Sequence, residues 1–170
     1  RPKSSAASDV YKRQIKAAQL GMKVALFEED KLGGVCLNWG CIPTKSLLHS
    51  AEFMEEANHF GLDKKDLTKI ALDKVVEMSR TASDNLSKGV NSLMKKNKID
   101  IYKHRAYPKK IDNEFFVNTT TDEISSKNMI IATGCKPRTI GDISFSNLIW
   151  SSKEAMIPKF LPKKLCIIGS

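Results

Sequence analysis

The chain has 170 residues, of which 41% are hydrophobic, and its 28 basic and 19 acidic side chains give a formal charge of +9. That length allows one domain with a core of ordinary size and the beginning of a second, and the apolar content is typical of a globular protein. No apolar run approaches the roughly 18 residues of a membrane span, and the first residues lack the apolar centre of a secretory signal. We therefore expect a cytoplasmic protein without a membrane partner.

The positive charge raises the question of nucleic-acid binding. The lysines are scattered in short groups, such as Lys64-Lys65 and Lys109-Lys110, and they lack the interleaved aromatic side chains on which single-strand binders stack bases. We interpret the charge as a solvated surface and expect no nucleic-acid partner.

Residues 1–14 are polar and contain no glycine. They do not provide the strand and turn that should precede the following helix. We therefore expect them to be a non-native leader joined within a first helix. Residues 15–21 then indicate the end of that helix, because Gly21 suits a left-handed C-terminal cap. Residues 22–27 form a short apolar run that is typical of a parallel strand, with Glu28 at its C-terminal end. This order predicts the second half of a βαβ unit.

Glu28 stands where dinucleotide-binding folds place an acidic residue that accepts hydrogen bonds from the adenosine ribose. In those folds a G-x-G-x-x-G loop about 20 residues earlier holds the pyrophosphate. Residues 1–14 contain no such loop. Glu28 therefore has two interpretations, a ribose ligand and a solvent-facing carboxylate at the end of a strand.

Cys36 and Cys41 follow two glycines and are set five positions apart, and residues 33–45 read GGVCLNWGCIPTK. On a regular helix, residues so spaced have Cα atoms about 8 to 9 Å apart, whereas a disulfide needs about 7 Å or less. If the two cysteines pair, the backbone must leave helical geometry between them, and Gly40 permits this. Pro43 suits the first turn of a following helix, which would place Cys41 at a helix N-terminus, where a thiolate is stabilised.

Three uses of this cysteine pair are open on spacing alone. Buried, reduced cysteines can serve as small hydrophobic residues. A zinc site would need a second pair of ligands, which Cys135 and Cys166 do not supply at suitable spacing. A bridge that closes so short a loop would add little stability, so a disulfide at this place would serve redox chemistry.

Residues 43–58 are predicted to form an amphipathic helix that Gly61 ends. A second helix carries a core-packing stripe in steps of three and four residues, and the two helices should pack antiparallel as a hairpin. The stripe consists of Leu67, Ala71, Val75, Met78, Ala82, Leu86, Val90 and Leu93. Residues 99–102, 114–118 and 128–132 are predicted strands, which form a small antiparallel meander feeding a buried strand.

Residues 33–45 closely resemble the active-site motif of the pyridine nucleotide-disulfide oxidoreductases, flavoenzymes that include dihydrolipoamide dehydrogenase, glutathione reductase and mercuric reductase. Leu37 and Ile42 make the motif more similar to the dihydrolipoamide dehydrogenases, because the glutathione and mercuric enzymes usually have valine at both places. Residues 132–134, Ala-Thr-Gly, resemble a second segment of the family, in which strand-end backbone approaches FAD.

The resemblance implies an α/β fold, namely an FAD-binding, doubly wound Rossmann-like domain with an inserted helical hairpin and a small antiparallel β-meander. It also implies that this domain is incomplete. Residues 15–163 would form the FAD-binding domain without its first strand and glycine loop. Residues 164–170 would be the first strand of a truncated NAD-binding domain, which reaches its first glycine at Gly169.

The resemblance further implies the chemistry of a dihydrolipoyl dehydrogenase, in which electrons pass from a dithiol substrate to a Cys36–Cys41 disulfide, then to FAD and then to NAD+. Cys36 would exchange with the substrate, Cys41 would face the flavin, and Lys45 would lie near flavin N5. The implied catalytic residues are Cys36, Cys41 and Lys45. The implied cofactor-binding residues are Glu28, Gly33, Gly34, Val35, Cys36, Lys45, Arg105, Ala106, Thr133 and Gly134.

The implied partner is the dihydrolipoyl group of a 2-oxo acid dehydrogenase or glycine cleavage complex, and the full-length protein would be a homodimer. The truncated chain alone is expected to be inactive. The alternatives are a flavoenzyme like glutathione reductase or mercuric reductase, and a non-enzymatic cysteine or metal-binding module.

Overall fold

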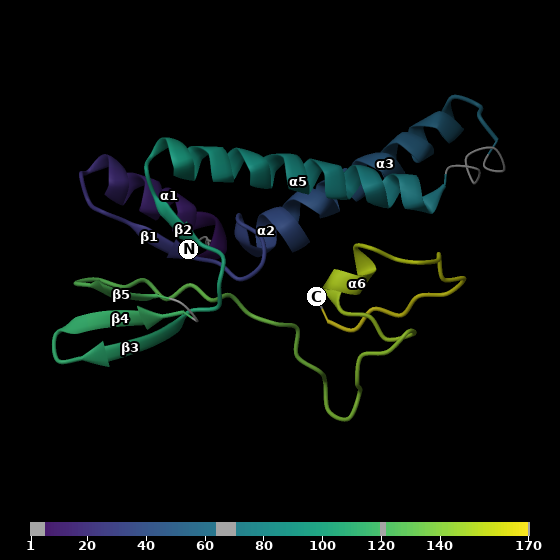
Figure 1. The fold of residues 1–170 in the computed structure, drawn as a ribbon. Helices are drawn as coiled ribbons and strands as arrows, with labels where there is room; N and C mark the ends of the chain where they lie inside the picture. Colours follow the sequence, from purple (N-terminus) through teal and green to yellow (C-terminus); the bar gives the residue numbers. More distant parts are fainter. Residues whose placement is uncertain (1–5, 64–70, 120–121, 170) are drawn as a thin grey trace. The chain divides into compact units, whose positions relative to one another are not determined.

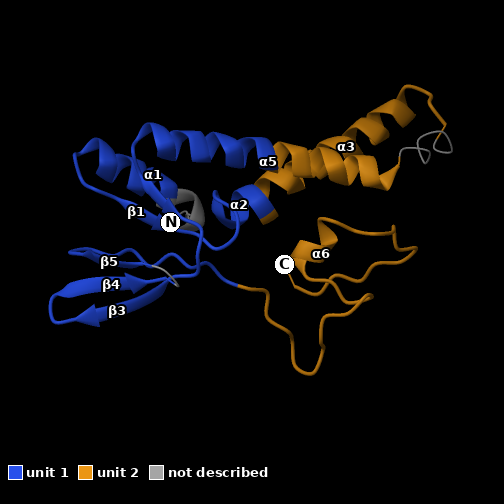
Figure 2. Cartoon of the chain, in the orientation of Figure 1, with its two compact units in different colours: residues 1–38, 84–135 blue, residues 39–83, 136–170 orange. Residues whose placement is uncertain are grey.

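The computed structural model describes residues 6–63, 71–119 and 122–169 (Figure 1). The elements in chain order are α1 (Ala6–Gln19), β1 (Ala25–Phe27), α2 (Gly34–Trp39), α3 (Cys41–His59), α5 (Leu72–Lys96), β2 (Asp100–Tyr102), β3 (Tyr107–Ile111), β4 (Glu114–Asn118), β5 (Glu123–Ser126) and α6 (Ser152–Ala155). Two compact units are present, residues 1–38 with 84–135 and residues 39–83 with 136–170 (Figure 2). Within the described residues, no helix is both long and apolar enough to cross a membrane.

The first unit contains the predicted parallel strand. β1 pairs in parallel with β2, and the rings of Phe27 and Tyr102, which are partners in this register, stack with centroids 4.9 Å apart. Gly21 follows α1 with a φ of 84°, as expected for a left-handed cap. The core of this unit is built on the buried side chains of Val90, Met94 and Ile99, and it includes Ile15, Leu26 and Leu37 among the side chains packed around them.

A three-stranded antiparallel sheet in the order β3-β4-β5 confirms the predicted small meander. Only the predicted strand 114–118 belongs to it, as β4. The predicted strand 99–102 pairs instead with β1, as β2. In the β3–β4 hairpin, the partners Ile111 and Glu114 leave two residues for the turn, and Asp112 adopts a φ of 52° there.

Two strand predictions are wrong. Residues 128–132 and 164–169 form no strand with any described part of the chain, and Ile131 and Ile167 are exposed to 70% and 79%. The apolar composition of these segments is suited to a buried strand, but a strand is stable only when a neighbouring strand satisfies its backbone donors and acceptors. The sequence supplies the apolar side chains without the neighbour.

Both helices of the predicted hairpin are present, and their boundaries need small changes. α3 begins two residues before Pro43, and it ends where Gly61 takes a φ of 93° and donates its N–H to the Asn58 carbonyl. α5 covers most of the second predicted helix; Leu67 of its stripe lies outside the described residues.

The predicted apolar stripe of α5 coincides only in part with the face that the structure buries: Val90 lies in the core, as predicted. Met78, Leu86 and Leu93 of the stripe are exposed, whereas Ser79 and Ser83 are buried. Their hydroxyls donate to carbonyls of their own helix, from Ser79 to Val76 at 2.7 Å and from Ser83 to Ser79 at 3.2 Å. A serine satisfied in this way can be buried on a closely packed helix face at little cost.

Candidate redox site

The cysteine motif is folded as two helices with a break between them. α2 carries Cys36 and ends at Trp39, and Gly40, with φ −149° and ψ −115°, precedes α3, which starts at Cys41. Both cysteines are disulfide-bonded, and Cys135 and Cys166 are free, so the bridge joins Cys36 to Cys41. The helix break at Gly40, the position of Cys41 at a helix N-terminus and the disulfide are therefore confirmed.

Cys36 is half-buried and Cys41 is exposed. Pro43 is buried within the first turn of α3, where its missing N–H leaves no intrahelical bond unmade. Lys45 is exposed on the same helix, one turn after Cys41.

Gly33 and Gly34 form the turn that leads into α2. They adopt φ angles of 110° and 69°, which side chains with a Cβ rarely take. A Cβ on Gly33 would also lie 2.6 Å from Cδ1 of Leu37. Glycine is therefore required at Gly33 for two independent reasons, while Val35, the next predicted cofactor residue, is exposed.

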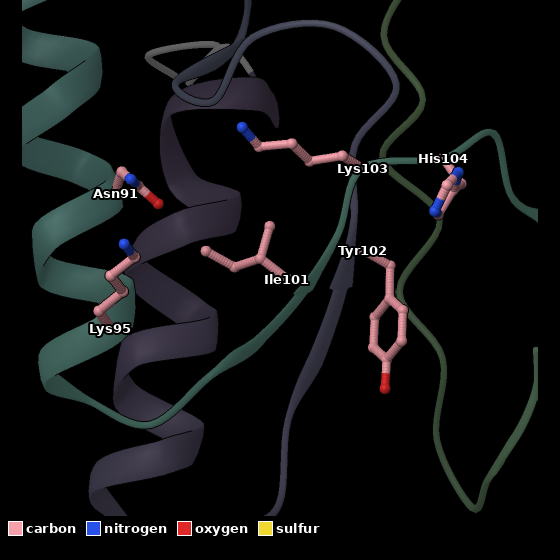
Figure 3. Close-up of a pocket in the computed structure, with 6 residues that line it drawn as sticks. All are labelled: Asn91, Lys95, Ile101, Tyr102, Lys103 and His104. Carbon is pink, nitrogen blue, oxygen red and sulfur yellow. The ribbon is translucent and has the colours of Figure 1, made fainter.

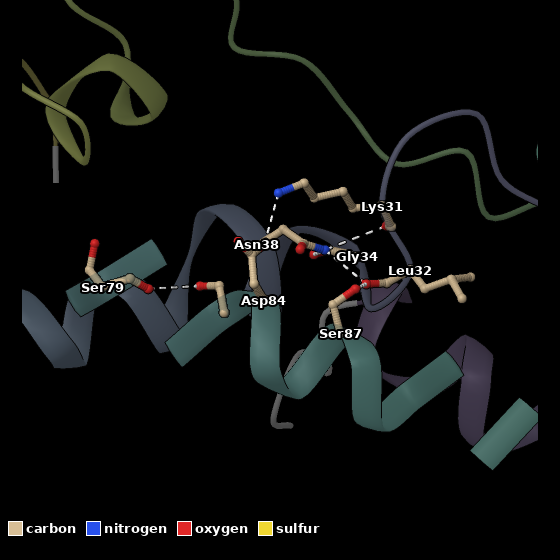
Figure 4. A network of polar contacts seen from close by, with 8 residues as sticks. Lys31, Leu32, Gly34, Asn38, Ser79, Asp84 and Ser87 are labelled. Carbon is tan, nitrogen blue, oxygen red and sulfur yellow. Dashed lines mark hydrogen bonds and ion pairs between the residues drawn. The ribbon is translucent and has the colours of Figure 1, made fainter. Parts of the chain in front are cut away.

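A network of polar contacts holds this turn (Figure 4). Asn38 is buried, and its side-chain amide donates to the carbonyls of Leu32 at 3.1 Å and of Gly34 at 3.0 Å. Ser87 of α5 donates its hydroxyl to the same Leu32 carbonyl at 2.9 Å, and the Lys31 ammonium lies 2.9 Å from the Asp84 carboxylate. Ser87 and Asp84 were not predicted from the sequence, because contacts between residues 55 and 53 positions apart leave no periodic signal.

In the second unit, two cations contact the indole of Trp39. The Arg80 guanidinium carbon is 4.8 Å from the ring centroid, and the Lys153 ammonium is 4.2 Å from it. Such contacts are worth about 0.5–2 kcal/mol each, depending on how far the cation is desolvated. They hold the end of α2 that directly precedes the helix break.

The predicted adenosine-binding residues lie at one edge of the parallel strand pair. The Glu28 N–H donates to the Tyr102 carbonyl at 3.0 Å, and its carboxylate accepts from the Asp30 N–H at 2.9 Å. Arg105 and Ala106 follow the end of β2, and the Arg105 guanidinium lies 6.0 Å from the ring centre of Tyr107. Because parallel strands end at a common edge, the structure brings Glu28 and this segment together.

An open pocket of about 310 Å³ lies at the same strand end (Figure 3). It is lined by Asn91, Lys95, Ile101, Tyr102, Lys103 and His104. Asn91 and Lys95 project from α5 on one side of β2, and Tyr102 and His104 lie on the other side. The pocket offers cationic groups next to the predicted adenine contact, and its residues were not predicted from the sequence.

Thr133 and Gly134 are exposed, and no strand positions them. Gly134 has a φ of 72°, and a Cβ there would meet no atom within 4 Å. The positive φ fits the predicted role of this glycine, but the strand end at which the family segment stands is not formed.

The described residues therefore fit FAD only in part. Glu28 presents a carboxylate at the strand edge where a ribose is expected, and the disulfide and the exposed Lys45 lie at the start of α3, where the flavin ring is expected. The pyrophosphate needs backbone N–H groups in a glycine-rich turn at a helix N-terminus, and residues 1–14 contain no glycine. As for metals, no group of three or more His, Cys, Asp and Glu side chains in the described ranges could hold an ion.

The parallel strand pair, the glycine turn and the disulfide at a helix N-terminus stand in the order that the resemblance of residues 33–45 implies. Residues 11–170 match the sequence model of the Pyridine nucleotide-disulphide oxidoreductase family, and the chain belongs to that family.

The particular relatives are dihydrolipoyl dehydrogenases. The chain is 41% identical to the one from Rhizobium etli and 42% identical to the one from Zymomonas mobilis, over 94% of its own length in both cases. It covers 37% and 35% of those two proteins, so the chain spans about a third of the length of the curated relatives it matches.

Two solved structures resemble the fold. LpdA from Mycobacterium tuberculosis matches with a TM-score of 0.76 and 16% identity, over 94% of this chain and 36% of that one. The HOCl-induced flavoprotein disulfide reductase RclA from Escherichia coli matches with a TM-score of 0.71 and 21% identity, over 93% and 34%. These likenesses confirm the predicted α/β fold class of the FAD-binding Rossmann type, in incomplete form.

Proposed function

We propose that the chain carries the dithiol-oxidising centre of a dihydrolipoyl dehydrogenase. The observation that supports this most directly is the Cys36–Cys41 disulfide at the N-terminus of α3, in a chain about 40% identical to dihydrolipoyl dehydrogenases. A bridge that closes so short a loop restricts the unfolded chain only slightly, so its value to the protein is chemical.

The reaction is thiol–disulfide exchange. One thiolate of the dihydrolipoyl group attacks the sulfur of Cys36, which forms a mixed disulfide and releases the Cys41 thiolate. The second substrate thiolate then attacks the substrate sulfur of the mixed disulfide and displaces the Cys36 thiolate, so that the lipoyl disulfide leaves and two electrons remain on the two cysteine sulfurs. The two protons that the substrate thiols released to solvent balance the negative charge left on these sulfurs. Cys36 is thus the exchanging residue and Cys41 the one that retains the electrons.

FAD, when bound, would carry these two electrons from Cys41 to NAD+. Lys45 lies one helical turn from Cys41 and would place a positive charge where the reduced ring becomes anionic. Glu28 would accept hydrogen bonds from the ribose, and Arg105 and Ala106 would lie along the adenine. Gly33, Gly34, Val35, Thr133 and Gly134 complete the proposed cofactor-binding set.

The substrate carrier would be a lipoyl group of a 2-oxo acid dehydrogenase or glycine cleavage complex, and the enzyme would work as a homodimer in the cytoplasm. Residues 1–14 would take no part in cofactor binding, residues 15–163 would belong to the FAD-binding domain, and residues 164–170 would open the NAD-binding domain.

The test compares two reductants on a variant in which Cys135 and Cys166 are serine. The oxidised variant is mixed with dihydrolipoamide or with reduced glutathione, and alkylation followed by mass spectrometry gives the rate at which Cys36 and Cys41 become thiols. The control is an oxidised peptide of residues 33–45, which has the same bridge without the fold. We expect the folded chain to prefer dihydrolipoamide over glutathione more strongly than the peptide does; an equal ratio of rates would contradict the proposal.

A further inference from the structure

The turn before the redox disulfide is tied to a helix that carries no reacting group. The Leu32 carbonyl accepts two hydrogen bonds, one from the Asn38 amide at 3.1 Å and one from the Ser87 hydroxyl at 2.9 Å (Figure 4). Asn38 belongs to α2 and stands between the two cysteines in the sequence, whereas Ser87 belongs to α5. The Leu32 carbonyl oxygen thereby links the turn before Cys36 both to α2 and to α5.

This fixation matters because the turn itself is intrinsically loose. Gly33 and Gly34 have the largest backbone freedom of any residue type, and both adopt positive φ angles that an unrestrained chain would readily leave. The buried Asn38 amide and the half-buried Ser87 hydroxyl are the side-chain donors that the structure places on the turn's carbonyls.

The nearby ion pair contributes less. Lys31 and Asp84 are 2.9 Å apart, but their side chains are 49% and 47% exposed. Exposed pairs of this kind are worth about 0–1 kcal/mol, because solvent screens the charges and long side chains lose freedom. Of these two polar contacts, the hydrogen bond of Ser87 is therefore the stronger tie from α5, beside the apolar packing of Leu32 and Leu37 against Val90 and Met94.

We infer that Ser87, acting through the Leu32 carbonyl, is a positioning residue that sets the redox equilibrium of the Cys36–Cys41 disulfide. The inference rests on the proposed function, in which this bridge must open and close in every turnover. In the dithiol state, a loose turn lets Cys36 move and gives that state additional conformational freedom. The Ser87 hydrogen bond removes this freedom and so favours the bridge.

The experiment measures the equilibrium between bridge and dithiol in mixtures of reduced and oxidised dithiothreitol, in the variant with serine at Cys135 and Cys166. Each bridge that opens converts one reduced dithiothreitol to its cyclic disulfide and yields two protein thiols, which alkylation and mass spectrometry count. Ser87→Ala should shift the equilibrium about two- to tenfold toward the dithiol, the effect expected for one net hydrogen bond. Alanine favours helix, so α5 itself should persist.

The matched control is Ser92→Ala on the same helix, since the Ser92 hydroxyl donates only to Lys88 of its own helix, at 3.0 Å. It should leave the equilibrium unchanged, and Ser87→Thr, which keeps the hydroxyl, should restore it. The inference is overturned if Ser87→Ala has no effect, or if Ser92→Ala has the same effect. If the parent chain forms no reversible bridge at all, the proposed function fails together with the inference.

Discussion

Gly33 is the residue at which the geometry of the redox site is least tolerant of change. Its φ of 110° disfavours any residue with a Cβ, and a Cβ placed there would lie 2.6 Å from Leu37 Cδ1. The turn that carries Cys36 can therefore be built only without a side chain at this place. Cys36 and Cys41 form the disulfide, and Gly33 allows the backbone to turn between β1 and α2.

Gly33→Ala should lower the free energy of unfolding by about 1–3 kcal/mol, because it adds a strained φ and a clash at one position. Urea denaturation monitored by circular dichroism would measure it. The matched control is Gly89→Ala in α5, where a Cβ would meet no atom within 4 Å and φ is not positive. That change should instead stabilise the chain by about 0.5–1 kcal/mol. Equal effects at the two glycines would refute the account of Gly33.

At the scale of elements, α6 shows how a short helix can be fixed by its cap. The Ser151 N–H donates to the Glu154 carboxylate at 2.9 Å, the Ser151 hydroxyl also bonds that carboxylate, and the Lys153 N–H donates to the Ser151 hydroxyl at 3.2 Å. This capping box orients the helix from which Lys153 reaches the indole of Trp39.

The cap should depend on pH. The hydrogen bond from the Ser151 hydroxyl, followed by the one from its backbone N–H, holds the pKa of Glu154 below its ordinary value of 4.5. A folded-state pKa below the unfolded one means that the contribution is complete above pH 4.5 and is lost as the pH falls through the lower value. Carboxyl NMR titration should show this low pKa and a rise toward the ordinary value in Ser151→Ala, which removes the hydroxyl donor and keeps the backbone N–H. An unchanged titration in that variant would contradict the capping account.

The elements that the sequence predicted well are those with a strong local pattern. Residues 114–118, with Phe115, Phe116 and Val117, form β4 with the predicted bounds. β3 was missed because Pro108 and the two following lysines suggest a turn, yet β3 is an edge strand, where proline and lysine are tolerated.

Residues 128–132 were predicted as a strand because their side chains are apolar, but side-chain pattern does not reveal whether a pairing partner exists. The same limit applies to the redox site. Spacing alone predicted the helix break at Gly40 if the cysteines pair, whereas the tie between Ser87 and Leu32 depends on packing between distant segments. The apolar stripe of α5 was predicted only in part for a related reason. Ser79 and Ser83, whose hydroxyls donate to carbonyls of their own helix, occupy positions on the buried face where apolar residues were expected.

At the scale of the whole molecule, the residues proposed for the adenosine end of FAD are present, whereas the turn expected for its pyrophosphate is not. Glu28 and the segment after β2 stand at one strand edge, while the first 14 residues contain no glycine for a pyrophosphate turn. Helix N-terminal N–H groups in such a turn are the main anion-binding device of dinucleotide folds.

The chain as it stands should therefore bind FAD weakly. Titration of FAD fluorescence with the protein should show no stoichiometric complex, and a variant with a strand and a G-x-G-x-x-G loop placed before Ile15 should purify as a yellow protein. Stoichiometric flavin on the unaltered chain would show that residues 1–14 had been misjudged.

The central claim is that Cys36 and Cys41 are one reversible redox pair and that Cys135 and Cys166 stand outside it. The most direct measurement is a mass-spectrometric map of disulfide-linked peptides after mild oxidation, repeated after dihydrolipoamide is added. We expect one dominant bridge, between Cys36 and Cys41, and we expect it to disappear on reduction. Cys135 and Cys166 should be alkylated in both samples. A dominant bridge to Cys135 or Cys166, or a Cys36–Cys41 bridge that dihydrolipoamide does not open, would contradict it.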